Sequence, residues 1–288
     1  MGESANGWGG SIGDRSRGLK VVIFCGGLGV RMGEETLLLP KPMIRIGNRP
    51  ILRHIMRYYS AWGHKEFILC LGYKGEVIKE YFLSHNEAMT SDFVLDRRAT
   101  GDRVDLLRHD FDDWRITFVD TGMHATIGER LKAVEPYLGD EEFFLATYGD
   151  GLTDVVIPEM ISSLVRSDKL AIFLSVHTPY NAHIVRSSAD GTVTSMQDMS
   201  KSDIRINGGF FVLRREILEH ILPGDEFVEE TFARLIPEGR IGAFLYDGFF
   251  GPMDTIKDRQ RLEALQESGE PPWQLRPNEV SSMEPFVA

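Results

Sequence analysis

The segment CGGLGVRMGEETLLLPKPM, at residues 25–43, combines glycines with two cationic side chains and suits phosphate chemistry. Its glycines allow backbone N–H groups to approach a phosphate closely. Arg31 adds a planar guanidinium that matches phosphate oxygens, and Lys41 adds a compact point charge between Pro40 and Pro42. The alternative is a glycine turn with two solvated cations, and the stiff Pro-Lys-Pro triplet favours the phosphate site.

Two well-known phosphate loops do not match this segment. The GxxxxGK(S/T) motif is absent, and the Gly27-x-Gly29 pair is followed by Gly33, one residue too far for the dinucleotide-binding GxGxxG pattern. An NAD-dependent oxidoreductase is therefore disfavoured.

Two aspartates stand where a carboxylate could serve the same site. Asp150 lies between two glycines and follows the apolar run Phe143–Thr147, which places its carboxylate at a strand end, although a plain turn aspartate is the alternative. Asp254 precedes a predicted helix, so it could equally cap that helix. The two residues are far apart in the sequence, so only the fold could bring them to one Mg²⁺ ion.

Short apolar strands alternate with helical segments and predict the scaffold that positions these residues. We expect strands at 19–24, 66–71, 116–119, 143–147, 171–177 and 208–213, and helices at 51–62, 77–83, 129–138, 157–165 and 258–267. This alternation is typical of an α/β sheet with helices on both faces. Ligands of such sheets bind beyond the carboxyl ends of the strands, where the glycine-rich breaks at 26–33 and 149–151 occur. A loop is expected at 248–255.

The composition excludes several classes of protein. The 288 residues are 42% hydrophobic and 26% charged, as in a folded soluble protein, and no apolar run reaches the roughly 20 residues of a membrane span. Cys25 and Cys70 give neither a disulfide framework nor a cysteine-built zinc site. A net charge of −11 disfavours a nucleic-acid partner. The polar N-terminus has no signal-peptide core, so a cytoplasmic location is expected.

Several longer motifs resemble one enzyme family. They are GGLGVRM with PKPM, LGYKGEVIKEYF at 71–82, VDTG at 119–122, TYGDG at 147–151, INGGFFVL at 206–213 and GPMDT at 251–255. Together they resemble the sugar-1-phosphate nucleotidyltransferases, and most closely the glucose-1-phosphate cytidylyltransferases. This resemblance implies a Rossmann-like three-layer α/β sandwich with a mixed, mostly parallel central sheet.

We expect this domain at 19–269, between a disordered tail at 1–18 and an irregular C-terminal tail at 270–288. The resemblance implies a nucleotide-binding half at about 19–150 and an acceptor-binding half at about 151–269. It also implies that an insertion at 84–115 makes subunit contacts in a homo-oligomer.

The resemblance implies a Mg²⁺-dependent reaction in which an acceptor phosphate attacks the α-phosphorus of a nucleoside triphosphate and expels pyrophosphate. Asp150 and Asp254 would hold the metal, and the catalytic cations would be Lys41, Arg31 and Arg130. The nucleotide-binding residues would be Gly26, Gly27, Leu28, Gly29, Val30, Arg31, Thr121, Gly122 and Gly149. The acceptor-binding residues would be Asn207, Gly208, Glu230 and Lys201.

Departures from the family pattern concentrate in the acceptor half. Gln197-Asp198-Met199 stand where the family has a Glu-Lys-Pro triplet that grips the sugar and its phosphate, so Lys201 would have to replace the missing lysine. The family's Gly-Arg-Phe-Gly stretch has no match at 179–183. In the nucleotide half, Val30 replaces a threonine, and Glu129 puts a carboxylate beside an expected anion site, which is unfavourable unless it points away.

These patterns predict a nucleotidyltransferase that uses CTP, or alternatively UTP or dTTP, and transfers CMP to a phosphorylated small molecule. The acceptor would be a sugar 1-phosphate or another phosphate or phosphonate, with no membrane or nucleic-acid partner. Two alternatives are a glucose-1-phosphate cytidylyltransferase proper and a non-catalytic nucleotide- or sugar-phosphate-binding regulator derived from the family. The retained Lys41, Asp150 and Asp254 argue against the regulator, whereas the changed acceptor half argues for it.

Overall fold

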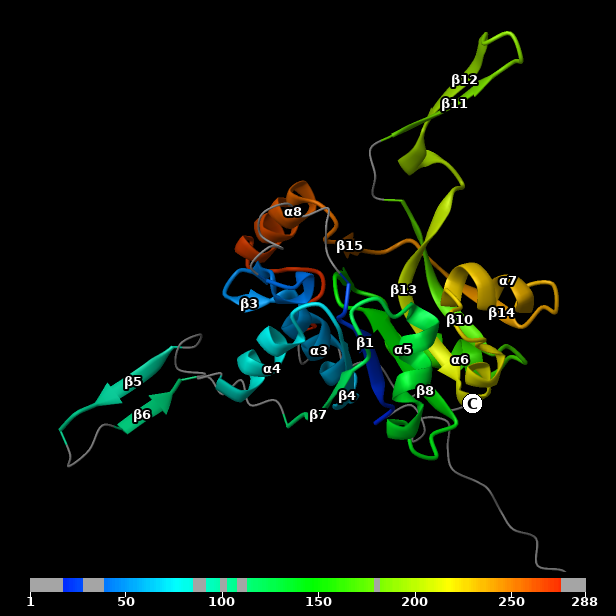
Figure 1. Cartoon of the computed structure of the whole chain (residues 1–288). Coiled ribbons are helices and arrows are strands. Elements are labelled where there is room, and N and C mark those ends of the chain that lie inside the picture. The colour runs from blue at the N-terminus through cyan, green and yellow to red at the C-terminus, as the bar shows by residue number, and fades with distance from the viewer. Residues whose placement is uncertain are drawn as a thin grey trace, which may run out of the picture.

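A computed structural model describes residues 18–27, 39–84, 92–98, 103–107, 113–178 and 182–275. Its centre is a seven-stranded sheet (Figure 1). The strands, in spatial order, are β14 (Ile241–Tyr246), β10 (Ala171–His177), β13 (Arg205–Arg214), β8 (Phe143–Tyr148), β1 (Val21–Phe24), β4 (Glu66–Leu71) and β7 (Arg115–Asp120). Strand β13 runs antiparallel to both of its neighbours, and the other pairs of this sheet are parallel. The predicted mixed, mostly parallel sheet is confirmed.

Helices cover both faces of this sheet. They are α3 (Ile51–Ala61), α4 (Gly75–Ser84), α5 (Ile127–Val134), α6 (Ile157–Val165), α7 (Phe232–Leu235) and α8 (Ile256–Glu267). Along β1, Val21 and Ile23 join a buried cluster with residues of α3 and α6, whereas Val22 and Phe24 join another with residues of α5 and α7. This alternation follows from the pleat of the strand, and both faces are apolar because both are covered. The expected three-layer sandwich is therefore present.

The helices begin and end where local chemistry predicts. Pro50 precedes α3, and Ile51, Ile55 and Tyr59 recur every four residues to form its buried stripe. The Thr255 side chain accepts the N–H of Asp258 in a capping box that starts α8. The capping role that Asp254 could have had is thus taken by Thr255.

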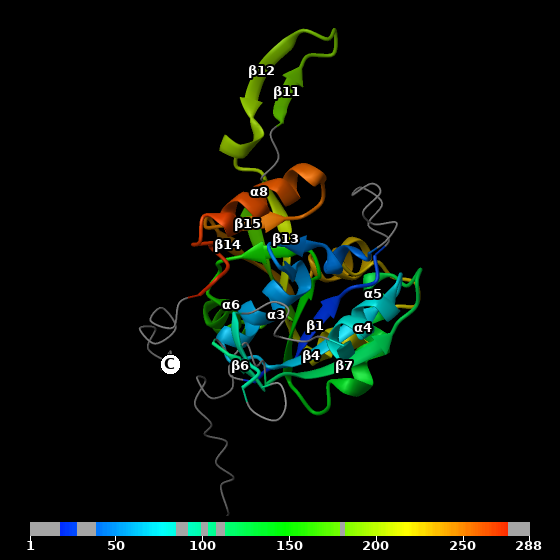
Figure 2. The same ribbon diagram turned by 90° about the vertical axis from the view of Figure 1, so that its left-hand side faces the viewer.

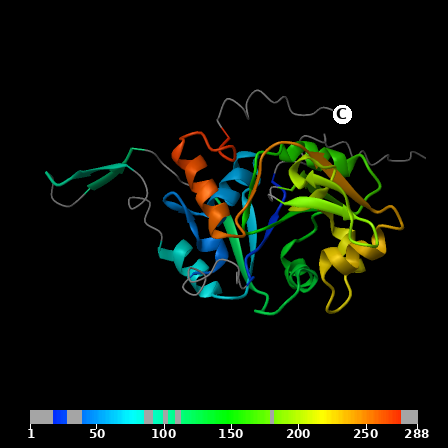
Figure 3. The same ribbon diagram turned by 90° about the horizontal axis from the view of Figure 1, so that it is seen from above.

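Among the described residues, four two-stranded pairs lie outside the predictions. They are β2 (Arg45–Ile46) with β3 (Arg49–Pro50), β5 (Phe93–Asp96) with β6 (Arg103–Leu106), β9 (Gly151–Thr153) with β15 (Phe250–Pro252), and β11 (His183–Ser187) with β12 (Val193–Asp198). The pairs β5–β6 and β11–β12 project from the body as hairpins (Figures 1, 2 and 3). The loop expected at 248–255 is wrong in part, because β15 lies within it and pairs with β9.

Short helical turns complete the fold. They are the 3-10 turns η2 (Lys41–Met43), η4 (Glu135–Tyr137), η5 (Met199–Lys201) and η6 (Arg215–His220), and the π-helical turn η7 (Phe227–Thr231). None of the helices in the described part of the chain is long and apolar enough to cross a membrane.

The two halves of the expected domain share one sheet. Strand β13 of the second half pairs with β8 of the first, so that Phe210 lies opposite Thr147. The two halves, which change over near residue 150, are therefore joined within one continuous sheet. The N-terminal tail lies outside the described residues up to residue 17.

The domain extends past the expected limit at residue 269. Trp273 is 3% exposed and belongs to the buried cluster that contains α3. Its indole N–H donates to His54 Nδ1 at 3.3 Å, and its ring packs on Phe249 with the ring centroids 5.7 Å apart. Residues 270–275 carry no helix or strand, as expected of an irregular segment, but burial of a large aromatic ring holds them on the core.

Replacing Trp273 with alanine should lower the free energy of unfolding by about 3–5 kcal/mol, because the change removes a buried aromatic ring. Urea unfolding followed by circular dichroism measures this difference. The control is Gln274→Ala at the exposed neighbouring position, which should change stability by less than about 0.5 kcal/mol. A Trp273 variant as stable as the control would show that this segment does not stabilise the core.

Candidate functional site

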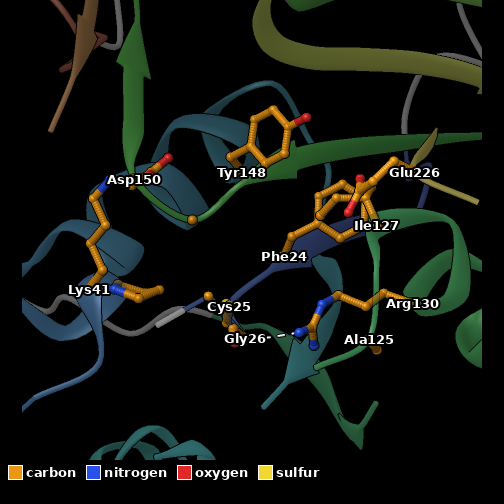
Figure 4. Close-up of a pocket in the computed structure, with 13 residues that line it drawn as sticks. Phe24, Cys25, Gly26, Lys41, Ala125, Ile127, Arg130, Tyr148, Asp150 and Glu226 are labelled. Carbon is orange, nitrogen blue, oxygen red and sulfur yellow. Dashed lines mark hydrogen bonds and ion pairs between the residues drawn. The ribbon is translucent and has the colours of Figure 1, made fainter. Parts of the chain in front are cut away.

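Two cavities lie beyond the carboxyl ends of the central strands and share the residues that follow β8. The first cavity, of about 380 Å³, is bounded by the turn after β1, by Lys41 and by the start of α5 (Figure 4). The second cavity, of about 270 Å³, is bounded by Asn207 and Gly208 of β13 and by Asp254. Tyr148 and Asp150 line both cavities. A ligand in each would therefore meet its neighbour beside Asp150.

Lys41 joins the two candidate metal ligands at this junction. Its Nζ donates to Asp150 Oδ2 at 2.6 Å and to Asp254 Oδ1 at 2.7 Å. The three side chains are mostly buried, with 11% of Lys41, 30% of Asp150 and 17% of Asp254 exposed. The structure thus brings together three residues that the sequence motifs place far apart.

Local structure explains how the two aspartates meet. Asp150 lies between β8 and β9, directly before Gly151, and Asp254 lies just beyond β15, whose Pro252 pairs with Gly151. The Met253 N–H also donates to the Asp150 carbonyl at 2.9 Å. This short antiparallel pair holds the two carboxylates next to each other.

Lys41 is placed by the rigid turn that carries it. Pro40 and Pro42 flank it, and the Met43 N–H donates to the Pro40 carbonyl at 2.8 Å to close η2. Burial lowers the pKa of the Lys41 ammonium, but attraction and hydrogen bonds from Asp150 and Asp254 outweigh it, so the pKa lies above its usual value. Lys41 is therefore a permanent positive charge at the junction.

The donor set of Asp150 and Asp254 fits Mg²⁺. Carboxylate oxygens are hard ligands, and Mg²⁺ is commonly bound by one or two protein carboxylates together with water and substrate phosphates. Within the described residues, no cluster of three or more His, Cys, Asp or Glu side chains could hold a metal ion. A metal held by this pair of carboxylates would thus keep most of its coordination positions for phosphate oxygens and water.

Arg130 lines the first cavity but serves as a brace between strand ends. Its guanidinium donates to the Gly26 carbonyl at 3.4 Å (Figure 4), and also to the Leu71 carbonyl at 3.2 Å and to Thr121 Oγ1 at 2.5 Å. These acceptors follow or end β1, β4 and β7. A Cβ at Gly26 would lie 2.1 Å from the Arg130 guanidinium, so this position requires glycine. The contact between Arg130 and phosphates stays a prediction.

The remaining nucleotide-binding predictions divide into three groups. Gly27 and Gly149 line the first cavity, as Gly26 does. Thr121 belongs to the Arg130 brace and also donates to the Leu71 carbonyl at 2.8 Å, and Gly122 follows it with a φ of +95°. Leu28, Gly29, Val30 and Arg31 lie outside the described residues, so their roles stay predictions.

Glu129, the unexpected carboxylate of the nucleotide half, points away from the first cavity. It is exposed, and its Oε2 accepts the Thr126 N–H at 2.9 Å in the capping box that starts α5. The family departure at this position therefore serves the helix end and places no charge at the anion site.

The four predicted acceptor-binding residues separate into two pairs. Asn207 and Gly208 line the second cavity, and Asn207 Oδ1 accepts the Gly209 N–H at 2.9 Å. Glu230 and Lys201 are exposed and border neither cavity in the described structure. Glu230 Oε2 accepts the Glu226 N–H at 2.7 Å, and Lys201 lies in η5 at the base of the β11–β12 hairpin. The contact of these two side chains with the acceptor therefore stays a prediction.

Two side chains of the first cavity that carry oxygen were not among the site residues predicted from the sequence. Tyr148 and Glu226 both line it. Tyr148 lies within the TYGDG motif, so that motif was a signal for it, whereas Glu226 belongs to no motif. Cys25 also borders the cavity, but burial raises the pKa of its thiol well above the usual value, which favours a packed side chain over a reactive thiolate.

Comparisons with known proteins decide the family. No family model matches the chain. The glucose-1-phosphate cytidylyltransferase of Salmonella typhimurium is 41% identical over 260 residues, which are 88% of this chain and 98% of that protein. This chain belongs to the sugar-1-phosphate nucleotidyltransferase family. A probable glucose-1-phosphate cytidylyltransferase of Bacillus subtilis is 37% identical over 262 residues, which are 89% of this chain and 100% of that protein.

A solved structure agrees with the fold. A UDP-glucose pyrophosphorylase complexed with UDP-glucose superposes with a TM-score of 0.63 at 14% identity, covering 88% of this chain and 100% of that one. The resemblance and the fold expected from the sequence are confirmed. As a sugar-1-phosphate nucleotidyltransferase, the protein is an enzyme whose family joins a nucleotide to a phosphorylated partner.

Replacing Arg130 with alanine should lower the free energy of unfolding by about 2–4 kcal/mol, because acceptors at three strand ends each lose a charged hydrogen-bond donor. Chemical unfolding monitored by tryptophan fluorescence measures the loss. Arg186→Ala, on the exposed face of β11, is the matched control and should leave stability unchanged. If the two variants unfold at the same denaturant concentration, Arg130 is not a structural brace.

Proposed function

We propose that this enzyme transfers CMP from CTP to a phosphorylated small molecule, with Mg²⁺, and releases pyrophosphate. The observation that carries the proposal is the convergence of Lys41, Asp150 and Asp254 at the junction of two cavities. The choice of CTP is supported by relatives named as glucose-1-phosphate cytidylyltransferases over nearly their whole length.

In the proposed reaction, an oxygen of the acceptor phosphate attacks the α-phosphorus of CTP. The new P–O bond forms as the bond from the α-phosphorus to the bridging oxygen breaks, and that oxygen leaves on pyrophosphate with its electron pair. The two reactants are anions, so catalysis consists mainly of alignment and charge neutralisation. Bound Mg²⁺ would supply positive charge to the phosphate oxygens.

Each residue of the junction has one task in this reaction. Lys41 lies where the two cavities meet, so its ammonium neutralises the charge that develops between acceptor and α-phosphate. Asp150 and Asp254 hold the metal and keep the Lys41 ammonium in place through their hydrogen bonds. Tyr148 lines both cavities and forms a wall between the nucleotide and the acceptor.

The second cavity supports an acceptor with little charge beyond its reacting phosphate. None of the described residues that line it is lysine or arginine, and Asn207 and Phe250 offer an amide and an aromatic ring. The acceptor phosphate would thus be neutralised at Lys41 and the metal rather than by the family's missing lysine. Sugar 1-phosphates and other phosphates or phosphonates fit this description, and glucose 1-phosphate is the reference compound.

Pyrophosphate release with a panel of substrates tests the proposal. The protein should release pyrophosphate fastest with CTP, more slowly with UTP and dTTP, and in the presence of one acceptor among sugar 1-phosphates, other phosphates and phosphonates. Removal of Mg²⁺ with a chelator should stop release, and added Mg²⁺ should restore it. No release with any nucleotide and acceptor would contradict the proposed activity.

Substitutions at the junction test the assignment of residues. Lys41→Ala and Asp254→Asn should each lower kcat by about 10²–10³-fold, because the first removes positive charge placed where the transition state develops negative charge and the second removes a carboxylate ligand of the proposed metal. Lys132→Ala, at an exposed lysine of α5 paired with Glu135, is the control and should retain full activity. Circular dichroism shows whether the variants stay folded. A folded Lys41 variant with normal kcat would contradict the catalytic role assigned to Lys41.

A further inference from the structure

The junction of the two cavities determines how a nucleotide would lie in the first cavity, given the proposed function. The α-phosphorus must lie beside Lys41 and Asp150, where the second cavity opens. Figure 4 shows Lys41 and Asp150 on one side of the first cavity and Arg130 and Glu226 on the other. The nucleoside of the substrate would therefore extend toward Arg130 and Glu226.

Glu226 is poorly suited to contact a phosphate group. A carboxylate repels the phosphates of a nucleotide, so its position at the side remote from Lys41 agrees with a nucleoside at that end. The side chain is half-buried and borders the cavity. A hydrogen-bond acceptor in such a place is suited to a hydroxyl or an amine of the ligand.

The protein holds Glu226 in a defined position. Its carboxylate accepts the Ile127 N–H at the first turn of α5, and its own N–H donates to Glu230 Oε2 at 2.7 Å. The preceding residue is fixed as well, because Thr126 Oγ1 donates to the Asp225 carbonyl at 2.7 Å. The carboxyl group of Glu226 is thus attached to the same helix that carries Arg130.

Arg130 is the second fixed group on this side of the cavity. Its guanidinium is tied to Gly26, Leu71 and Thr121, and the residue is 3% exposed. The N–H groups of Arg130 are thus engaged by the protein, and the hydrogen-bonding group that this wall offers to a ligand is the Glu226 carboxylate. A base that binds there must therefore offer a hydrogen-bond donor to Glu226.

Cytosine and uracil differ in the group that they would offer to Glu226. Cytosine offers an exocyclic amine, which donates, next to ring N3 and O2, which accept. Uracil and thymine offer an accepting O4 next to a donating N3–H, so their O4 would face the Glu226 oxygens. Lone pairs that face each other leave both groups unpaired, which costs binding energy.

We propose that Glu226 is a specificity-determining residue that accepts a hydrogen bond from the exocyclic amine of cytosine and thereby selects CTP over UTP and dTTP. The proposal rests on the proposed function, since it takes the orientation of the nucleotide from the reaction. Adenine has a similar amine but is one ring larger, so Glu226 separates cytosine from the other pyrimidines.

Variants of Glu226 test the proposal, with exposed Glu229 of the same turn as the matched position. We compare the wild type, Glu226→Gln, Glu226→Ala and Glu229→Gln by equilibrium binding of CTP, UTP and dCTP, and by kcat/KM in the pyrophosphate assay. The glutamine variant keeps an oxygen for the Ile127 N–H, so it preserves the helix cap. Thermal unfolding verifies that each variant is folded.

Both Glu226 variants should reduce the preference for CTP over UTP by at least about tenfold, which corresponds to the loss of one base contact. The glutamine variant should bind UTP better than the wild type does, because its amide N–H₂ faces O4. Glu229→Gln should keep the wild-type preference. The ratio of CTP to dCTP affinity should be the same in every protein.

Three results would overturn the inference. One is an unchanged CTP-to-UTP ratio in folded Glu226 variants, which would leave Glu226 as a helix cap only. Another is a change confined to the CTP-to-dCTP ratio, which would place Glu226 at the ribose. The third is a wild type that binds UTP as tightly as CTP. If the wild type binds CTP selectively but releases no pyrophosphate, the proposed function is wrong. The inference about Glu226 is then still tested by the binding ratios.

Discussion

Two carboxylates that share one ammonium are the constraint on which this site depends. Asp150 and Asp254 would repel each other if they were alone, and Lys41 Nζ lies within 2.6 and 2.7 Å of them. The β9–β15 pair and the proline-flanked turn of Lys41 hold all three in place. An arrangement fixed before substrate arrives needs little reorganisation during reaction, which is how charge stabilisation becomes catalysis.

The net charge of −11 says little about this site, because the relevant charges are local. Lys41 and Arg130 lie on opposite sides of the first cavity and have different tasks. Lys41 is held by carboxylates and stays available to phosphates, whereas Arg130 is used by buried acceptors of three strand ends. A cation in a motif is therefore not necessarily a ligand contact, and its hydrogen-bond partners decide which it is.

Much of the fold was predictable because buried strands and helices carry strong apolar patterns. The predicted bounds 66–71, 157–165 and 171–177 are those of β4, α6 and β10. The projecting hairpins were not predicted, since their strands are short and pair only with each other. Val185 and Met196 of β11–β12 stay largely exposed, so no periodic contact with the core marks that hairpin. Trp273 was missed for the opposite reason, because a single buried ring in a proline-containing segment has no periodicity.

By itself the sequence determined the scaffold and the chemistry of the junction, because strand and helix periodicity and the motifs around Lys41, Asp150 and Asp254 are local properties of the chain. Only the tertiary structure decided which side chains share a cavity. It joined Lys41 to Asp254 across 213 positions, turned Glu129 into a helix cap, left Lys201 and Glu230 outside both cavities and put Glu226 beside Arg130. The physical reason is that sheet order and helix packing set these distances, and neither is encoded in any single segment of the chain.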